Sequence, residues 1–270
     1  MGELSVVLIL MAAGGVLGCS TARAEEIHGP LAGVAWSPPR DWTAHDTDGS
    51  VHCLGNGRLC VYGQGPDIIQ IFGPPYSTTS IGRAGLDQPG LTCQSRRVLG
   101  TAIWQHRIES EGRVVAVVTD FVDSERPCFV RHVQAAAPVA FVFHLETDVR
   151  TAANDAMVPG AKGGFLGETP IGKPSVPFGN YPIPFAFFHQ FAWRGEVEAA
   201  VESSAVVRFR FGPGQSTLYV TGGPELAACM EHMKAILSEE YASLLARTKS
   251  WWEKPKTWCT AQNNSSKNWG

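Results

Sequence analysis

The feature that most limits the fold of this chain is a series of short strand-like segments that continues to about residue 220 without an intervening helical segment. Residues 98–108 and 112–119 flank the polar turn ESEGR, and residues 129–135 and 139–146 flank AAAP. These segments are rich in β-branched and aromatic residues, which favour strands. Strands at hairpin spacing indicate antiparallel sheets stacked as a large sandwich. We therefore predict a mainly β fold and not a parallel α/β sheet.

Two further stretches define the outline of the sandwich. In residues 205–211 three apolar side chains alternate with two arginines, the pattern of a strand with one buried face and one wet face. Residues 149–181 are rich in Gly, Pro and Ala and have weak periodicity. We expect this stretch to be a long excursion from the sheets.

The sequence changes character at Gly223-Pro224-Glu225, where proline takes the first helical position and a carboxylate lies in the first turn. Apolar residues then recur at spacings of three and four, which predicts one long helix over residues 223–254, after a sandwich over 25–222. Pro255 ends this helix, and the polar residues 255–270 form a loose tail. The apolar stripe consists of Leu226, Met230, Met233, Leu237, Tyr241, Leu244, Thr248 and Trp251.

The first 24 residues read as a signal peptide. The apolar segment 6–17 is too short for a membrane-spanning helix, which takes about 20 residues. Two ends compete: the lipobox-like VLGCS, which would leave a lipid on Cys19, and the A-x-A motif 22–24, which signal peptidase would cut before Glu25. We expect an exported protein that is periplasmic, extracellular or an outer-membrane lipoprotein, with a lipid anchor as its only contact with a membrane.

Charge and cysteine usage exclude several partners. The 270 residues are 44% apolar, and 22 Lys and Arg against 25 Asp and Glu give a net charge of −3, so there is no electrostatic reason to expect nucleic-acid binding. Without Cys19 six cysteines remain, none of them in a C-x-x-C motif, and no histidine lies close enough to a cysteine pair to suggest a zinc site. We predict no metal site and no cofactor.

The segment VHCLGNGRLCVYG, residues 51–63, contains a glycine pair but lacks the G-x-G-x-x-G spacing and is followed by a strand. It therefore does not bind phosphate, and its Asn-Gly pair predicts a type I′ hairpin turn. If Asn56 and Gly57 are the two central residues, Cys53 and Cys60 lie directly opposite each other and are candidates for a structural disulfide. A three-residue loop would remove that match.

No residue is predicted to be catalytic. Glycoside hydrolysis needs two carboxylates that face each other across a cleft. The pairs Asp120 with Asp123 and Glu146 with Asp148 lie at strand ends, where acids are ordinarily solvated turn residues. The histidines are scattered and no G-x-S-x-G motif occurs, so a Ser-His-Asp triad is not expected either.

Aromatic residues are densest over 178–195. Aromatic rings can stack on the apolar face of a sugar, but we expect most of the phenylalanines here to fill the core. Tyr181 and Trp193 keep a polar atom and are better candidates for a sugar-facing edge. With Tyr76 they form the set of candidate carbohydrate contacts.

Three stretches, LGNGRLCVYG, IFGPPYS and EEYASLLARTKSWWEK, together with the strand series and final helix, resemble the N-terminal β-supersandwich and linker helix of (α/α)6-barrel glycoside hydrolases and phosphorylases. The resemblance covers roughly residues 30–254 and includes the glucoamylase-like and maltose-phosphorylase-like enzymes. It implies an oligosaccharide or polysaccharide partner. It also implies a helical catalytic barrel that would dock near Trp251 and Trp252 and carry the acid and base, and that is missing from this chain.

Three functions follow as hypotheses. The first is a carbohydrate-associated sandwich domain that is not catalytic alone, from a gene that would be truncated or frame-shifted. The second is a stand-alone carbohydrate-active enzyme: a hydrolase, lyase or epimerase. The third is a surface lipoprotein with no sugar role.

Overall fold

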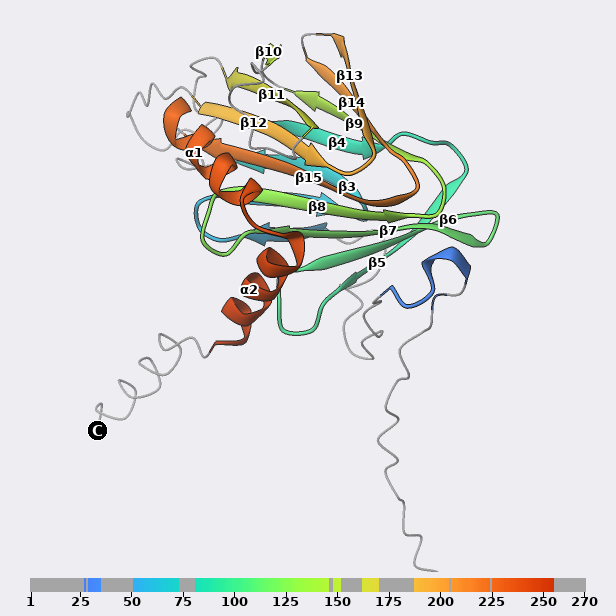
Figure 1. Cartoon of the computed structure of the whole chain (residues 1–270). Helices are drawn as coiled ribbons and strands as arrows, with labels where there is room; N and C mark the ends of the chain where they lie inside the picture. The colour runs from blue at the N-terminus through green and yellow to red at the C-terminus, as the bar shows by residue number, and fades with distance from the viewer. Residues whose placement is uncertain are drawn as a thin grey trace, which may run out of the picture.

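Two antiparallel sheets make up most of the computed structural model (Figure 1). The structure describes residues 27, 29–34, 51–72, 81–145, 148–151, 162–169, 187–203, 205–223 and 225–254; for 72, 148–151, 162–169 and 187–188 this covers the backbone alone. Sheet A contains, in spatial order, β1 (Val51–Gly55), β2 (Cys60–Gln64), β3 (Asp67–Phe72), β4 (Gly82–Leu86), β9 (Val139–Leu145), β14 (Val206–Phe211) and β13 (Val197–Ser203). Sheet B contains β10 (Asp148–Thr151), β11 (Lys162–Thr169), β12 (Phe187–Arg194), β15 (Gly214–Gly223), β8 (Cys128–Ala135), β7 (Arg113–Val122), β6 (Trp104–Ser110) and β5 (Leu91–Arg97).

The predicted mainly β, antiparallel architecture is confirmed, and the ESEGR turn joins β6 to β7 as a hairpin. The connection through AAAP does not make a hairpin, because β8 belongs to sheet B and β9 to sheet A. The step from β14 to β15 changes sheets in the same way. Within the predicted excursion, β11 pairs with β12, so part of that stretch extends sheet B.

The core lies between the sheets and is built from the alternating inward side chains of both. Phe209 is the centre of an aromatic group, with ring centroids 5.5 Å from Phe143, 5.7 Å from Phe191 and 5.6 Å from Trp193. The arginines that alternate with Phe209 along β14 point the other way, and Arg210 is exposed. The alternation predicted for residues 205–211 is therefore confirmed.

A charged pair is enclosed in this core. The Arg131 guanidinium on β8 donates to Asp120 Oδ1 at 2.9 Å and to Oδ2 at 2.6 Å, and its Nη2 also donates to the Pro66 carbonyl at 2.7 Å. The central carbon of the guanidinium, Arg131 Cζ, lies 4.3 Å from the Phe141 ring centroid. Burial opposes ionisation of Asp120, but Arg131 and His106 outweigh it and hold the pKa of Asp120 at about 2.

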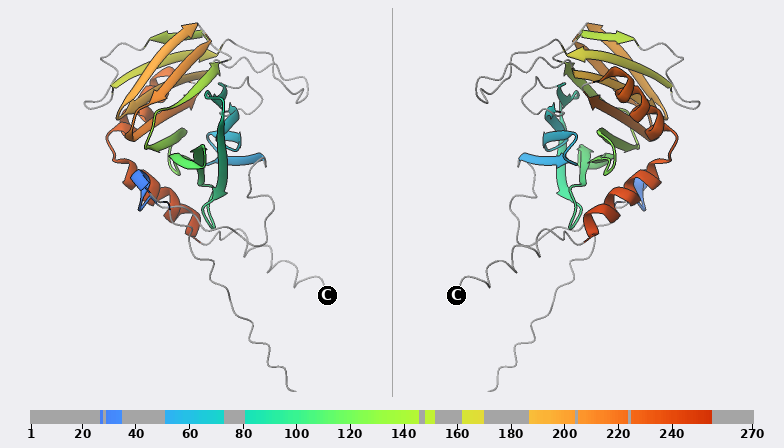
Figure 2. Two further views of the ribbon diagram at one scale, coloured as in Figure 1. Left: turned by 90° about the vertical axis from the view of Figure 1, so that its right-hand side faces the viewer. Right: turned by 90° about the vertical axis from the view of Figure 1, so that its left-hand side faces the viewer.

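The C-terminal residues form two helices, α1 (Leu226–Leu237) and α2 (Tyr241–Glu253), and not the single helix predicted. The backbone of Glu240 is extended, with φ −78° and ψ 146°, which ends the helical path between them. α1 packs on β12, β15 and β8, and both helices lie along one side of the sandwich (Figures 1 and 2). Neither helix, within the part of the chain that the structure describes, has the length and apolar character to span a membrane.

The N-terminal part of the described chain covers another region of sheet B. The short 3-10 helix Gly29–Leu31 packs on β7. Ile27 and Leu31 are buried there against Val117. This segment and the two helices close the outer face of sheet B from different sides, which leaves the outer face of sheet A as the more open surface of the sandwich among the described residues.

The buried pair predicts an asymmetric mutational response. Arg131→Met should destabilise the protein by about 3–5 kcal/mol, because it leaves the Asp120 carboxylate buried without its cation. The double variant Asp120→Asn/Arg131→Met should recover most of that loss. Urea denaturation followed by tryptophan fluorescence measures both variants. A loss below about 1 kcal/mol in the single variant, or a double variant no more stable than the single one, would contradict this account.

Candidate functional site

An open hollow lies on the outer face of sheet A and has a volume of about 960 Å³. It lies across β3, β4 and β9, whose inward side chains fill the core, so that alternate side chains point outward into the hollow. Ligand sites in proteins commonly have volumes of about 300–1,000 Å³. We call this hollow the sheet A groove; its polar lining consists of Gln64, Asp67, Gln70, Arg83, Asp87 and His144.

The groove carries charges of both signs at fixed places. Arg83 and His144 are directly opposite each other in the β4–β9 pairing. Asp67 Oδ1 accepts a hydrogen bond from the Leu86 backbone N–H at 2.9 Å, and Asp87 forms an ion pair with Arg208 of β14. Carboxylate, amide and guanidinium groups together supply both acceptors and donors. Such a lining suits a neutral ligand with many hydroxyl groups better than a strongly charged one.

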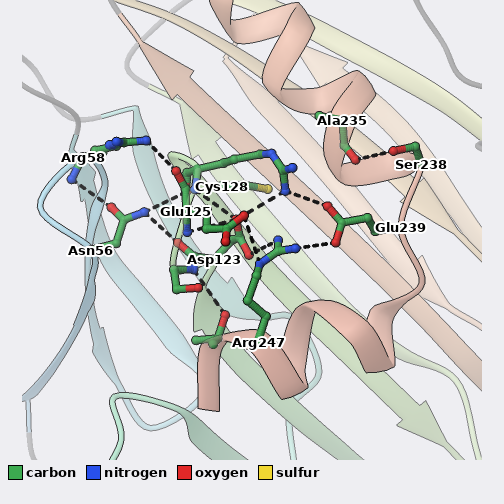
Figure 3. Close-up of polar contacts among 12 residues, drawn as sticks. Asn56, Arg58, Asp123, Glu125, Cys128, Ala235, Ser238, Glu239 and Arg247 are labelled. Carbon is green, nitrogen blue, oxygen red and sulfur yellow. Dashed lines mark hydrogen bonds and ion pairs between the residues drawn. The ribbon is translucent and has the colours of Figure 1, made fainter. Parts of the chain in front are cut away.

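A second polar cluster lies around the turn between β7 and β8 (Figure 3). The Asp123 side chain is 0% exposed. Its Oδ2 accepts from the Arg126 backbone N–H at 3.0 Å, as is typical of Asp at the start of a turn, and its Oδ1 accepts from Arg247 Nη2 of α2 at 2.7 Å. The Asp123 carboxylate therefore accepts hydrogen bonds both from its own turn and from α2.

The loop between β1 and β2 contacts the same turn. Asn56 Nδ2 donates to the Asp123 carbonyl at 2.6 Å and to the Arg126 carbonyl at 2.7 Å. Asn56 Oδ1 accepts from the backbone N–H of Arg58 at 2.8 Å and of Leu59 at 3.0 Å. Both the nitrogen and the oxygen of the Asn56 side-chain amide therefore form hydrogen bonds, and the side chain links sheet A to sheet B (Figure 3).

Glu239, between the two helices, completes the cluster. Its Oε1 accepts from Arg126 Nη1 at 2.8 Å and its Oε2 forms an ion pair with Arg247. Partial burial raises the pKa of Glu239, but the two arginines outweigh it and lower the pKa below its ordinary value. We call these residues the Asp123 cluster: Asn56, Asp123, Arg126, Glu239 and Arg247.

Arginine also satisfies the carbonyl groups left open where the helix breaks. Arg194 of β12 donates to the carbonyl oxygens of Leu237 and Glu239, the latter at 3.3 Å. The last carbonyl groups of a helix have no partner within the helix, and a cation there also interacts favourably with the helix dipole. The interruption of the predicted single helix is therefore stabilised by sheet B.

A Ser-His-Asp arrangement does occur, but inside the core. Ser95 Oγ is 2.8 Å from His106 Nδ1, and His106 Nε2 is 3.3 Å from Asp120 Oδ2. The three residues are at most 2% exposed, so no substrate can reach Ser95. The expectation that Asp120 and Asp123 are solvated turn residues is wrong, because each is buried in a pair with an arginine. Glu146 and the side chain of Asp148 lie outside the described residues.

Of the candidate carbohydrate contacts, Trp193 lies among the described residues. Trp193 is 6% exposed and faces the core beside Phe209, so the expectation of a sugar-facing Trp193 is corrected. It alternates in phase with Phe191 along β12, a period of two that places both side chains inside. Tyr76, Tyr181 and Cys19 lie outside the described residues.

The β1–β2 hairpin differs from its predicted register. Gly55 pairs with Cys60, and Cys53 pairs with Tyr62, so the two cysteines are diagonal neighbours and not direct partners. The loop has four residues because Asn56 accepts hydrogen bonds from the loop and lacks the positive φ of a type I′ turn, whereas Gly57 has a φ of 81°. The two sulfur atoms are nevertheless 3.3 Å apart.

The end of α2 carries the tryptophan pair. Trp251 and Trp252 meet edge to face, with ring centroids 4.9 Å apart, and both are half-buried. Among the described residues no group of three or more His, Cys, Asp or Glu side chains could hold a metal ion.

Sequence reasoning missed the groove and the Asp123 cluster. The turn motif DSERPC, residues 123–128, signals a capped turn, but nothing in it points to Arg247, 124 residues further along the chain. The groove residues come mainly from β3, β4 and β9, and β9 lies beside β4 in sheet A although more than fifty residues separate the two strands in the sequence.

Comparison with known proteins places the fold. No family model and no curated protein sequence matches the chain. A bacterial glucoamylase complexed with acarbose has a similar structure, with a TM-score of 0.54 and 8% identity over 86% of this chain and 39% of that chain. A putative kojibiose phosphorylase from human microbiome has a TM-score of 0.43 and 8% identity over 74% of this chain and 35% of that one.

The chain spans less than half the length of either protein. At the level of the fold, the predicted resemblance to the sandwich of glucoamylase-like enzymes is confirmed. The likeness covers most of this chain and shows the fold alone.

The role of Asn56 can be tested by its removal. Asn56→Ala should lower the free energy of unfolding by about 1–3 kcal/mol, because backbone groups of two loops lose their partners. Thermal unfolding followed by circular dichroism measures the change, with Thr92→Ala on the exposed side of β5 as the control. Equal melting temperatures for the two variants would show that Asn56 does not link the sheets.

Proposed function

We propose that this chain is an exported, carbohydrate-binding sandwich domain of a glycosidase-like protein and that it has no catalytic activity alone. The sheet A groove is the observation that carries the proposal, because it offers an open, polar surface of ligand size on a fold shared with a glucoamylase. Neutral saccharides are the proposed ligands, since both hydrogen-bond donors and hydrogen-bond acceptors line the groove, and its charged groups are of both signs.

The lack of turnover is proposed from the state of the groove carboxylates. Asp67 is engaged by a backbone N–H and Asp87 by Arg208, so each already has a structural partner. A helical catalytic barrel is the proposed partner domain, and it would dock near Trp251 and Trp252. Export rests on the apolar segment 6–17 and on the alternatives of lipidation at Cys19 or cleavage before Glu25.

A stand-alone carbohydrate-active enzyme is the second candidate, because Asp67 and Asp87 both line the groove. Two carboxylates across a cleft are the usual requirement for glycoside hydrolysis. A surface lipoprotein without a sugar ligand is the third.

Calorimetry with the purified chain and a panel of neutral oligosaccharides, maltose and plant oligosaccharides among them, tests the proposal. We expect binding to at least one member, weakened about tenfold or more by Gln70→Ala/Arg83→Ala through the loss of about 1.4 kcal/mol of binding free energy. Arg210→Ala, on the same face but outside the groove, is the matched control and should change the affinity less than about twofold.

The other outcomes decide against the proposal in different ways. Release of reducing sugar by the purified chain would contradict the absence of turnover and favour the enzyme, and loss of that activity in Asp67→Asn or Asp87→Asn would locate it. Failure to bind any member of the panel would favour the surface lipoprotein.

A further inference from the structure

The outer face of the β1–β2 hairpin holds two cysteine side chains in direct contact. Cys53 Sγ and Cys60 Sγ are 3.3 Å apart, within hydrogen-bonding distance for sulfur. The residue directly opposite Cys60 is Gly55, whose missing side chain leaves the space over which the sulfur atoms approach each other. A Cβ atom on Gly55 would lie 3.8 Å from Cys60 Sγ, in van der Waals contact with it.

This pair is accessible, unlike the buried cysteines of the domain. Cys53 is exposed and Cys60 is half-buried, whereas Cys128 and Cys229 are fully buried. Burial raises the pKa of Cys128 well above its ordinary value and that of Cys229 to about 11, so neither thiol ionises readily at neutral pH.

We propose that Cys53 and Cys60 form a reversible, redox-active thiol pair in which Cys60 attacks a low-molecular-weight disulfide and Cys53 resolves the product. This inference is independent of the proposed sugar ligand. It assigns distinct roles to the two cysteines and does not depend on their being direct cross-strand partners.

The contact between the two sulfur atoms favours Cys60 as the attacking group. It lowers the pKa of Cys60 to about 7 although partial burial raises it, and Tyr62 lowers the pKa further. The same contact raises the pKa of Cys53 above its ordinary value. The thiolate is the attacking species in disulfide exchange, so Cys60 reacts first.

The chemistry balances with a disulfide such as oxidised glutathione as the oxidant. The Cys60 thiolate attacks one glutathione sulfur, which breaks the glutathione disulfide and releases one glutathione thiolate. The Cys53 thiol loses its proton to solvent and attacks Cys60 Sγ, which releases the second glutathione thiolate. Two protein thiols are oxidised by two electrons, and one glutathione disulfide is reduced to two thiols.

Oxidation should also strengthen the link between the sheets. The new bond would close the loop between residues 53 and 60, which contains Asn56 of the Asp123 cluster. A short cross-linked loop restricts the unfolded chain, so the melting temperature of the oxidised domain should rise by roughly 5 °C.

Incubation of the purified chain with oxidised glutathione, followed by alkylation and tryptic digestion without reductant, tests the pair. Arg58 lies between the two cysteines, so a bond between them joins two separate tryptic peptides. We expect the joined peptides in the wild type and in Cys93→Ser, and their release by reduced glutathione. Alkylation of both cysteines after oxidation, with no joined peptides, would overturn the proposal.

The single variants test the order of attack. Cys53→Ser should keep a stable glutathione adduct on Cys60, because the resolving thiol is absent. Cys60→Ser should form an adduct on Cys53 severalfold more slowly, because Tyr62 lowers the pKa of Cys60 whereas partial burial raises that of Cys53. A faster adduct in Cys60→Ser would overturn the assigned roles even where the joined peptides form.

Discussion

The carboxylate of Asp123 holds together parts of the protein that the chain brings in from three distant regions. Its turn receives Asn56 from the β1–β2 loop of sheet A, and its Oδ1 binds Arg247 from α2. Arg247 and Arg126 both bind Glu239 at the interruption between the helices. Because the Asp123 carboxylate is fully buried, Arg247 and Arg126 have to remain in place for its charge to stay compensated.

The same arrangement bears on the sheet A groove. The hairpin that Asn56 holds includes β2, and β2 pairs with β3, which supplies Asp67 and Gln70 to the groove. In the core, Arg131 of sheet B donates to the carbonyl of Pro66, one residue before β3. Two polar contacts between the sheets therefore fix the strands that line the proposed saccharide site, although neither contact would touch the ligand.

Much of the architecture could be predicted from the sequence because its signals are local. The alternation of Val207, Phe209 and Phe211 with arginines shows the buried face of β14 directly. The change of sheet between β8 and β9 could not be predicted, because both strands are almost entirely buried and a three-residue connection is compatible with a hairpin. The break after α1 is hidden by an apolar stripe that continues in phase across it, while the contacts that stabilise the break come from Arg194 and from the pairing of Glu239 with Arg247. Asp120 and Asp123 could not be recognised as buried, because the fold is what brings Arg131 and Arg247 beside them.

Hydrogen exchange in Arg247→Met, read by mass spectrometry, tests most directly whether the Asp123 cluster joins sheet A to the helices. Arg247 forms ion pairs with Asp123, Glu125 and Glu239, and the β1–β2 loop contacts the same Asp123 turn, so an effect on the hairpin has to pass through that turn. We predict that amides of α2 and of the β1–β2 hairpin lose protection together while β12 and β15 remain protected. Faster exchange in α2 with an unchanged hairpin would contradict the account.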